Sequence, residues 1–271
     1  MTDLPIIFED NDLLVINKPA GMIVNRATSH HETSLQDLMV DYLHLADIPS
    51  GPIPDATAPP EAIFAFRQGM VHRLDKDTSG VILWAKNPTA LVALLHQFQK
   101  REVHKTYLCL VHGLLNTPEG RINLPLARKA TNRQIMSVSP AGRPAITTYQ
   151  VQSYYHGFDA TRLKDLTTPA INDLKPARLA QIYQGFTLLA AQPLTGRTHQ
   201  IRAHFTHRGH PLVGDTAYLP RRKARLDPLW CPRQFLHAAS ITFTHPLTKE
   251  TFTLTTPLPK DLQEALTWLT P

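Results

Sequence analysis

Apolar and polar residues alternate in some short stretches of the chain and apolar residues run together in others, and both patterns predict strands. Between residues 102 and 111 the alternation places Lys105 and Tyr107 on the same face of a strand. The turn-prone Asp10-Asn11-Asp12 joins the first two stretches, which predicts a strand pair at the start of the chain. Strands are predicted over residues 6–8, 13–16, 81–85, 102–111, 145–151 and 186–193.

Helices are predicted where apolar residues recur at helical spacing. One starts at Thr33, because Thr33 and Gln36 have the spacing of a capping box and the apolar residues that follow fall on one face. Another follows Asn87, whose side chain can cap a helix that has Pro88 at its first position. A short helix over residues 261–269 is expected to close the chain.

Two stretches have neither pattern. Residues 49–60 contain five prolines, and residues 152–183 lose their apolar periodicity and are interrupted by Pro169 and Pro176. We expect both to be irregular excursions from one domain that covers residues 1–271. Because strands from distant parts of the chain outnumber helices, the predicted fold class is α+β, with a mixed, largely antiparallel sheet and flanking helices.

Composition narrows the class of protein. The chain is 42% hydrophobic and 18% charged, which is typical of a globular protein, and its net charge of +6 gives a mild attraction to polyanions. Cys109 and Cys231 are too few for a disulfide framework and are interpreted as reduced packing residues, which fits a cytoplasmic location. No apolar run approaches the length of a membrane span, and the first residues lack the pattern of an export leader, so no membrane partner is expected.

The most informative segment is Val71–Gly80, with the sequence VHRLDKDTSG. It places Asp75 in an irregular stretch directly before the apolar run 81–85, and Thr78, Ser79 and Gly80 are turn formers. The sheet behind this loop is expected to hold the carboxylate rigidly, which favours a functional role over packing.

Together with Gly196–Arg202, GRTHQIR, this segment resembles the RluA family of RNA pseudouridine synthases. The family signatures H-R-L-D-x-x-T-S-G and G-R-T-H-Q-I-R are both matched without a gap, and the similarity continues at both ends of the chain, in 14–21 and 236–246. The resemblance implies a bisected sheet with a central RNA-binding cleft. Many members of the family carry an extra N-terminal RNA-binding module, and because the first expected strand begins near Ile6, we expect this chain to be a short form without it. The resemblance also implies that the partner is structured RNA, a stem-loop of tRNA or large-subunit rRNA, bound by a monomer.

The reaction of this family breaks the N1 glycosidic bond of uridine, rotates the uracil and joins its C5 to the same sugar carbon. It needs one ionised carboxylate and a pocket for the detached base, and no cofactor or metal. The resemblance implies that Asp75 is the catalytic carboxylate, that Arg197 pairs with it and keeps it charged, and that Tyr107 contacts the uracil. Whether Asp75 attacks the sugar, adds to the uracil or removes a ribose proton is left open.

RNA contacts are expected from basic residues around Asp75. A uridine inside a stacked helix must be flipped out, and the resemblance implies that Arg73, two residues from Asp75, fills the gap. His72, Lys105 and Arg202 are further candidates for RNA binding.

Several other interpretations compete with this one. Asp75-Lys76-Asp77-Thr78 has the wrong spacing for an aspartate-nucleophile phosphatase, and Asp75 with Asp77 could form the carboxylate pair of a glycosidase, which would release free uracil. The histidines between residues 199 and 210 lack the spacing of a zinc site, so no metal is expected. A different class of function is an RNA-binding or RNA-folding protein for which the isomerisation is incidental.

Overall fold

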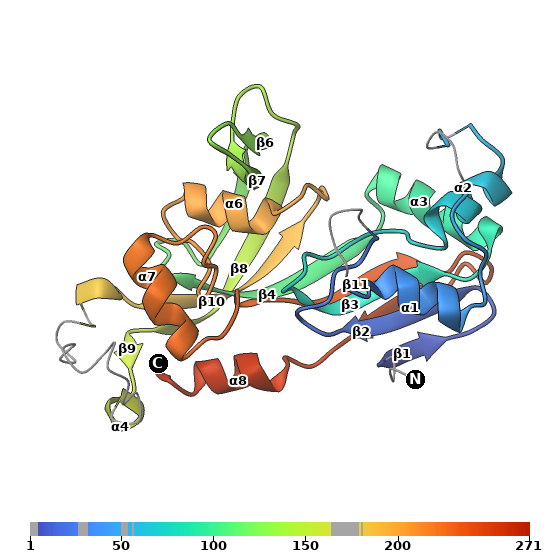
Figure 1. The fold of residues 1–271 in the computed structure, drawn as a ribbon. Coiled ribbons are helices and arrows are strands. Elements are labelled where there is room, and N and C mark those ends of the chain that lie inside the picture. The colour runs from blue at the N-terminus through green and yellow to red at the C-terminus, as the bar shows by residue number, and fades with distance from the viewer. Residues whose placement is uncertain (1–4, 27–31, 50–53, 56, 164–178, 180) are drawn as a thin grey trace. The chain divides into compact units, whose positions relative to one another are not determined.

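A computed structural model describes residues 5–26, 32–49, 54–55, 57–163, 179 and 181–271 (Figure 1). The chain divides into two compact units. Unit 1 comprises residues 1–105 and 238–256, and unit 2 comprises residues 106–237 and 257–271.

Unit 1 is built on a mainly antiparallel group of strands. Its strands are β1 (Ile6–Glu9), β2 (Leu13–Lys18), β3 (Ser79–Ala85), β11 (Leu236–Thr244) and β12 (Thr251–Thr255). They pair in the order β1-β2-β3-β11-β12. Its helices are α1 (Leu35–Tyr42), α2 (Pro60–Arg67) and α3 (Pro88–Lys100). Every residue of β3 is buried and alternate residues of β2 and β3 pack against Leu91 and Leu94 of α3, which explains why these strands are almost uninterruptedly apolar.

Unit 2 contains a second group of antiparallel strands in the order β4-β10-β8-β5. These are β4 (His104–His112), β10 (Phe186–Pro193), β8 (Ile146–Tyr155) and β5 (Glu119–Asn123). A separate hairpin consists of β6 (Leu126–Lys129) and β7 (Asn132–Val138), and β9 (Gly157–Phe158) pairs with β13 (Leu269–Thr270). The helices are α4 (Ala160–Leu163), α6 (Gln200–His207), α7 (Arg221–Leu226), α8 (Lys260–Leu266) and the 3-10 turn η1 (Asp227–Leu229).

Strand β4 separates two hydrophobic clusters of unit 2. Leu110 packs with Phe186 and Trp230 in one cluster, whereas Cys109 and Val111 pack with other residues in the second. The alternation predicted between residues 102 and 111 is therefore confirmed. Both cysteines are free and buried, as their interpretation as packing residues requires.

The α+β class and the largely antiparallel pairing are confirmed, and β10 has the predicted bounds. Helix α3 also begins as predicted, with Asn87 accepting a hydrogen bond from the Ala90 amide at 2.9 Å. One detail was wrong: α1 is capped by Ser34 with Asp37 rather than by Thr33 with Gln36. In the region of the predicted excursions, β8 continues to Tyr155 and Tyr183 is a core residue, while 50–53, 56, 164–178 and 180 lie outside the described residues.

Helix α6 and the β6–β7 hairpin were not predicted. Among the described residues, no helix is long and apolar enough to cross a bilayer.

Candidate active site

Asp75 lies in unit 1, half-buried, in a stretch without regular structure that leads directly into β3. The loop turns tightly, because the Thr78 amide donates to the Asp75 carbonyl at 3.1 Å, and Thr78 and Ser79 are almost completely buried. Gly80 has φ +115°, and a Cβ there would lie 2.2 Å from the Ala238 carbonyl oxygen, so only glycine allows this approach of β3 to β11. The backbone behind Asp75 is thus fixed by close packing.

The same loop is held by a buried cation. Lys18, at the end of β2, is completely buried, and its ammonium donates to the carbonyls of Pro19, Met22 and Lys76 at 2.7, 2.8 and 3.0 Å. The Gly21 amide adds a bond to the Lys76 carbonyl at 3.0 Å. Since Lys76 follows Asp75, these bonds position the backbone that carries the carboxylate.

A stack of three side chains lies beside the loop in unit 1. His72 stacks on Phe98 with ring centroids 5.0 Å apart, and the Lys105 ammonium lies 5.4 Å from the centre of the same ring. The His72 Nε2 accepts a hydrogen bond from the Leu83 amide at 3.0 Å, which requires an unprotonated nitrogen. Burial, with a smaller contribution from the charge of Lys105, lowers the pKa of His72 to about 3, and burial lowers the pKa of Lys105 to about 8. His72 is therefore neutral, whereas Lys105 titrates close to physiological pH.

Arg197 lies in unit 2, on the loop between β10 and α6. The Gln200 side chain organises this loop: its Oε1 accepts from the Arg197 amide at 3.1 Å and from the Thr195 hydroxyl at 2.7 Å, and its Nε2 donates to the Ile146 carbonyl at 2.9 Å. The Arg197 Nε donates to the Pro144 carbonyl at 3.2 Å. Arg197 is therefore anchored through its backbone and its side chain.

Tyr107 also belongs to unit 2. It lies on β4 opposite Ala191 of β10, is half-buried, and packs against the cluster that contains Cys109. Because β4 pairs with β10 from Tyr107 to His112, the backbone below this aromatic ring is rigid.

Arg202 has a partner inside unit 2. It is buried, its Nε and one terminal nitrogen donate to the two Asp215 carboxylate oxygens at 2.7 and 2.8 Å, and its guanidinium lies 5.0 Å from the Tyr218 ring centre. These contacts indicate a structural ion pair rather than an exposed RNA contact. Arg73, by contrast, is exposed, as its predicted role requires.

Asp75, His72, Arg73 and Lys105 thus fall in unit 1, and Tyr107, Arg197 and Arg202 in unit 2. The contact between Asp75 and Arg197 stays a prediction. No role was predicted for Lys18 or Gln200, whose hydrogen bonds hold the loops that carry Asp75 and Arg197. The signals for Lys18 were the proline that follows it at the end of an apolar strand and its place in residues 14–21, a segment that carries the family resemblance.

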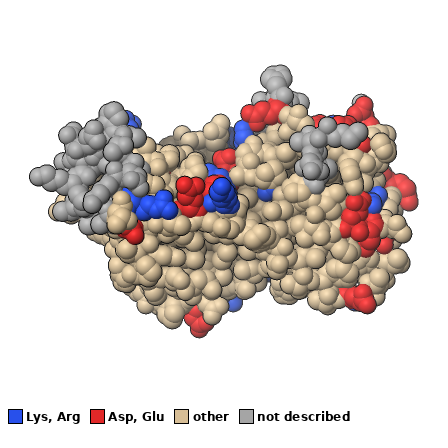
Figure 2. Space-filling model, turned by 90° about the horizontal axis from the view of Figure 1, so that it is seen from below, with Lys and Arg blue, Asp and Glu red and all other residues tan. Residues whose placement is uncertain are grey.

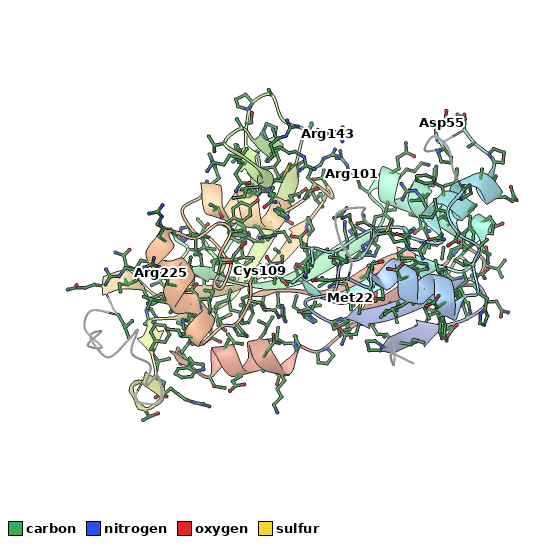
Figure 3. All side chains as sticks on the ribbon, in the orientation of Figure 1. Met22, Asp55, Arg101, Cys109, Arg143 and Arg225 are labelled. Carbon is green, nitrogen blue, oxygen red and sulfur yellow. The ribbon has the colours of Figure 1, made fainter. Side chains whose placement is uncertain are left out.

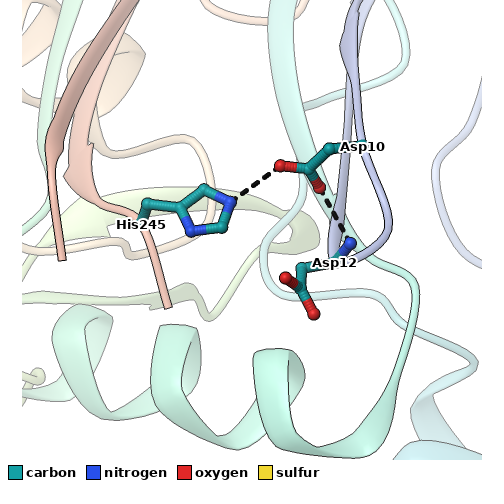
Figure 4. Close-up of side chains that lie close together, drawn as sticks. All are labelled: Asp10, Asp12 and His245. Atoms are coloured by element: carbon teal, nitrogen blue, oxygen red, sulfur yellow. Dashed lines mark hydrogen bonds and ion pairs between the residues drawn. The ribbon is translucent and has the colours of Figure 1, made fainter. Parts of the chain in front are cut away.

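A second group of polar side chains in unit 1 has the composition of a metal site. Ligand atoms of Asp10, Asp12 and His245 lie within 4.8 Å of one another (Figure 4). Asp10 accepts from the Asp12 and Leu13 amides and contacts His245 Nε2 at 2.8 Å, while His245 Nδ1 accepts from the Leu247 and Thr248 amides. Nε2 is therefore the protonated nitrogen, and the group joins two turns as a network of hydrogen bonds.

Comparisons with known proteins agree with this arrangement of motifs. The profile of the family described as RNA pseudouridylate synthase matches residues 12–207. The chain is 35% identical over 265 residues to the "Uncharacterized RNA pseudouridine synthase YlyB" of Bacillus subtilis, covering 97% of this chain and 72% of that protein. It is 36% identical over 273 residues to "Ribosomal large subunit pseudouridine synthase D" of Vibrio cholerae, covering 97% of this chain and 70% of that protein.

Solved structures are similar in fold. Human RNA Pseudouridylate Synthase Domain Containing 1 superposes with a TM-score of 0.63 at 24% identity, covering 98% of this chain and 88% of that one. Human RNA Pseudouridylate Synthase Domain Containing 4 superposes with a TM-score of 0.62 at 21% identity, covering 96% of this chain and 91% of that one.

Proposed function

The chain belongs to the RNA pseudouridylate synthase family, in its RluA group, and from this premise we propose that it isomerises particular uridines of a structured RNA to pseudouridine with Asp75 as the catalytic residue. As a pseudouridine synthase it is an isomerase that acts on RNA. The observation that carries the assignment of Asp75 is its position: a half-buried carboxylate on a loop fixed by Lys18 and by the approach of β3 to β11.

In the proposed reaction, Asp75 acts on the nucleoside as its N1 glycosidic bond breaks, and the uracil rotates before C5 bonds to the sugar carbon. A carboxylate does this only when ionised and oriented. Arg197 is proposed to keep Asp75 ionised, and the anchoring of Arg197 by Gln200 and Pro144 supports this because an immobilised guanidinium loses little entropy on pairing. The Tyr107 ring is proposed to contact the uracil while it is detached.

Base flipping belongs to the same proposal. The target uridine must leave its stack, and the exposed Arg73 is available to occupy the gap. Lys105 and His72 lie beside this loop; Lys105 can meet a phosphate, whereas the neutral His72 can offer only its ring and a neutral N–H. For Arg202 we propose no direct RNA contact, because its guanidinium is bound to Asp215.

The distribution of charge supports unit 2 as the main surface for the RNA backbone. Unit 2 has 18 Lys and Arg against 8 Asp and Glu, whereas unit 1 has 10 against 14. Acidic side chains are accordingly frequent over unit 1, at the right of Figure 2. Residues 120–158 contain five cations and no acidic residue. The exposed members of this set include Arg128, Lys129, Arg133 and Arg143, of which Arg143 is labelled in Figure 3.

The target is proposed to be large-subunit rRNA, because several relatives are named ribosomal large subunit pseudouridine synthase D, with a tRNA stem-loop as the second candidate. We further propose that the enzyme acts as a monomer in the cytoplasm, where its two thiols stay reduced.

The test is to incubate purified protein with unmodified rRNA and tRNA transcripts and to map new pseudouridines chemically. Asp75→Asn is expected to abolish their formation while RNA binding is retained, and Asp77→Asn, an exposed neighbour in the same loop, is the matched control and should remain active. If Asp75→Asn formed pseudouridine at the rate of the natural chain, the assignment would be wrong. Release of free uracil would instead identify a glycosidase.

A further inference from the structure

We propose that Tyr218 is a positioning residue whose hydroxyl group sets the β6–β7 hairpin relative to the loop that carries Arg197. The inference rests on the proposed function, because it concerns two elements that are proposed to meet the same RNA. Tyr218 lies outside both sequence motifs, in the turn-rich stretch between α6 and α7.

One oxygen atom joins the two elements. The Tyr218 hydroxyl accepts from the Met136 amide of β7 at 2.9 Å and lies 3.1 Å from the Met136 carbonyl and 3.2 Å from His199 Nδ1. When it donates its hydrogen to the Met136 carbonyl, the His199 Nδ1 supplies the hydrogen for the third contact. The hydroxyl thus binds the middle of β7 and the residue that precedes α6.

The rest of Tyr218 is fixed independently of that oxygen. Its amide donates to the Asp215 carbonyl at 2.9 Å, and its ring lies against the guanidinium of Arg202, which is bound to the Asp215 carboxylate. Removing only the hydroxyl, as in Tyr218→Phe, therefore leaves the ring and the ion pair in place. This separates positioning from packing.

His199 has a backbone conformation that needs support. Its φ of +52° is in the left-handed region, and its side chain forms no cap for α6. His199 is two residues from Arg197 and one from Gln200, which binds the Arg197 amide. A shift of His199 is therefore expected to move Arg197, and a shift of about 1 Å at a reacting group can lower a rate by about 100-fold.

The β6–β7 hairpin, which the Tyr218 hydroxyl binds at Met136, is positively charged. The hairpin presents Arg128, Lys129 and Arg133 to solvent, and its strand β7 packs against α6. With the hydroxyl present, the hairpin cations and Arg197 keep a fixed distance from each other. RNA whose phosphates are bound by the hairpin then has its target nucleotide placed correctly at Arg197. Without it, binding by the hairpin no longer fixes the position of Arg197.

The experiment compares Tyr218→Phe with Tyr154→Phe, which removes another half-buried hydroxyl of unit 2 that donates to a backbone carbonyl, that of Leu115 at 3.1 Å. Each is combined with Arg133→Gln, and single-turnover rates and RNA affinity are measured on the rRNA or tRNA transcript that the natural chain modifies. Tyr218→Phe is expected to lower the single-turnover rate at saturating enzyme by about ten-fold or more with a small change in affinity. Arg133→Gln should then cost less in the Tyr218→Phe chain than in the natural chain, whereas it should be additive with Tyr154→Phe.

Amide hydrogen exchange gives a readout that does not require activity. The Met136 amide should exchange faster in Tyr218→Phe and be unchanged in Tyr154→Phe, since only the first substitution removes its acceptor. Any one of three results would overturn the proposal. They are a single-turnover rate of Tyr218→Phe equal to that of Tyr154→Phe, additive effects of Tyr218→Phe and Arg133→Gln, and an unchanged exchange rate of the Met136 amide in Tyr218→Phe. If the natural chain forms no pseudouridine, the proposed function fails, while the exchange experiment still decides whether the hydroxyl couples the two elements.

Discussion

Lys18 illustrates how much of the site depends on one residue outside the chemistry. Its ammonium is completely buried and donates to three backbone carbonyls, one of which belongs to the residue after Asp75. A buried amine without such partners would be severely unfavourable, so the three carbonyls and the cation must be present together.

Lys18→Met keeps the length of the side chain but removes the donor to the carbonyls of Pro19, Met22 and Lys76, of which Lys76 keeps the hydrogen bond from the Gly21 amide. We expect it to lower the free energy of unfolding by about 2–4 kcal/mol, since each unsatisfied buried group costs about 1–3 kcal/mol and part of the cost is recovered by removing the charge. Urea unfolding measures this. Lys100→Met, at an exposed position of α3, is the control and should change stability by less than about 0.5 kcal/mol; an equal effect of the two substitutions would contradict the role of Lys18.

Lys105 gives the site a pH dependence. Burial lowers its pKa to about 8, so the free protein loses this positive charge as the pH rises through about 8, well before an ordinary lysine would. If Lys105 contacts phosphate, the affinity for RNA should fall between about pH 7.5 and pH 9. The free energy of unfolding should rise with pH in the range between about pH 8 and pH 10.5. In that range Lys105 keeps its proton in the unfolded chain but has lost it in the folded chain.

Lys105→Arg tests this prediction because arginine stays charged throughout the range. The variant should bind RNA with an affinity that no longer falls across this pH window, measured by titration at constant ionic strength. A fall of the same size in Lys105→Arg would assign the pH dependence to another group.

Among the helices and strands, those whose sequence pattern is set by local contacts were predicted best. The bounds of β10 and the Asn87–Pro88 start of α3 follow from apolar runs and from a cap within three residues. The cap of α1 was misassigned by one residue because Thr33-Ser34 offers two hydroxyls. Asp37 decides between them by accepting from the Ser34 amide, while Gln36 turns inward and binds Gln68.

Helix α6 shows why other elements could not be predicted. Gln200, Arg202 and His204 are all buried in it, which hides the apolar periodicity of a helix. Their partners are Ile146, Asp215 and Thr147, and two of these lie more than fifty residues away in the sequence. The same reason applies to part of the candidate site. Asp75 and Arg197 could be identified from motifs, but Lys18, which holds the loop of Asp75, and Pro144, which accepts from the Arg197 side chain, lie more than fifty residues away in the sequence.

Charge is unequally distributed between the two units of the protein. Unit 2 has 18 Lys and Arg and 8 Asp and Glu, an excess of ten positive charges. Unit 1 has 10 Lys and Arg and 14 Asp and Glu, an excess of four negative charges. Because RNA binding releases counterions from the backbone, the salt dependence of binding reports how many phosphates the protein neutralises.

The hairpin cations should account for part of that salt dependence. Replacing Arg128, Lys129 and Arg133 together by Gln is expected to flatten the plot of log affinity against log salt concentration by about 0.7–0.9 for each phosphate that the variant no longer neutralises. The matched control replaces three exposed cations of unit 1, Lys100, Arg101 and Lys249, by Gln, which changes the net charge by the same amount. If net charge alone drove binding, both triple variants would shift affinity equally. Because we expect the phosphates to lie along unit 2, only the hairpin variant should change the slope, and an equal change in both would show that the RNA does not distinguish the two units.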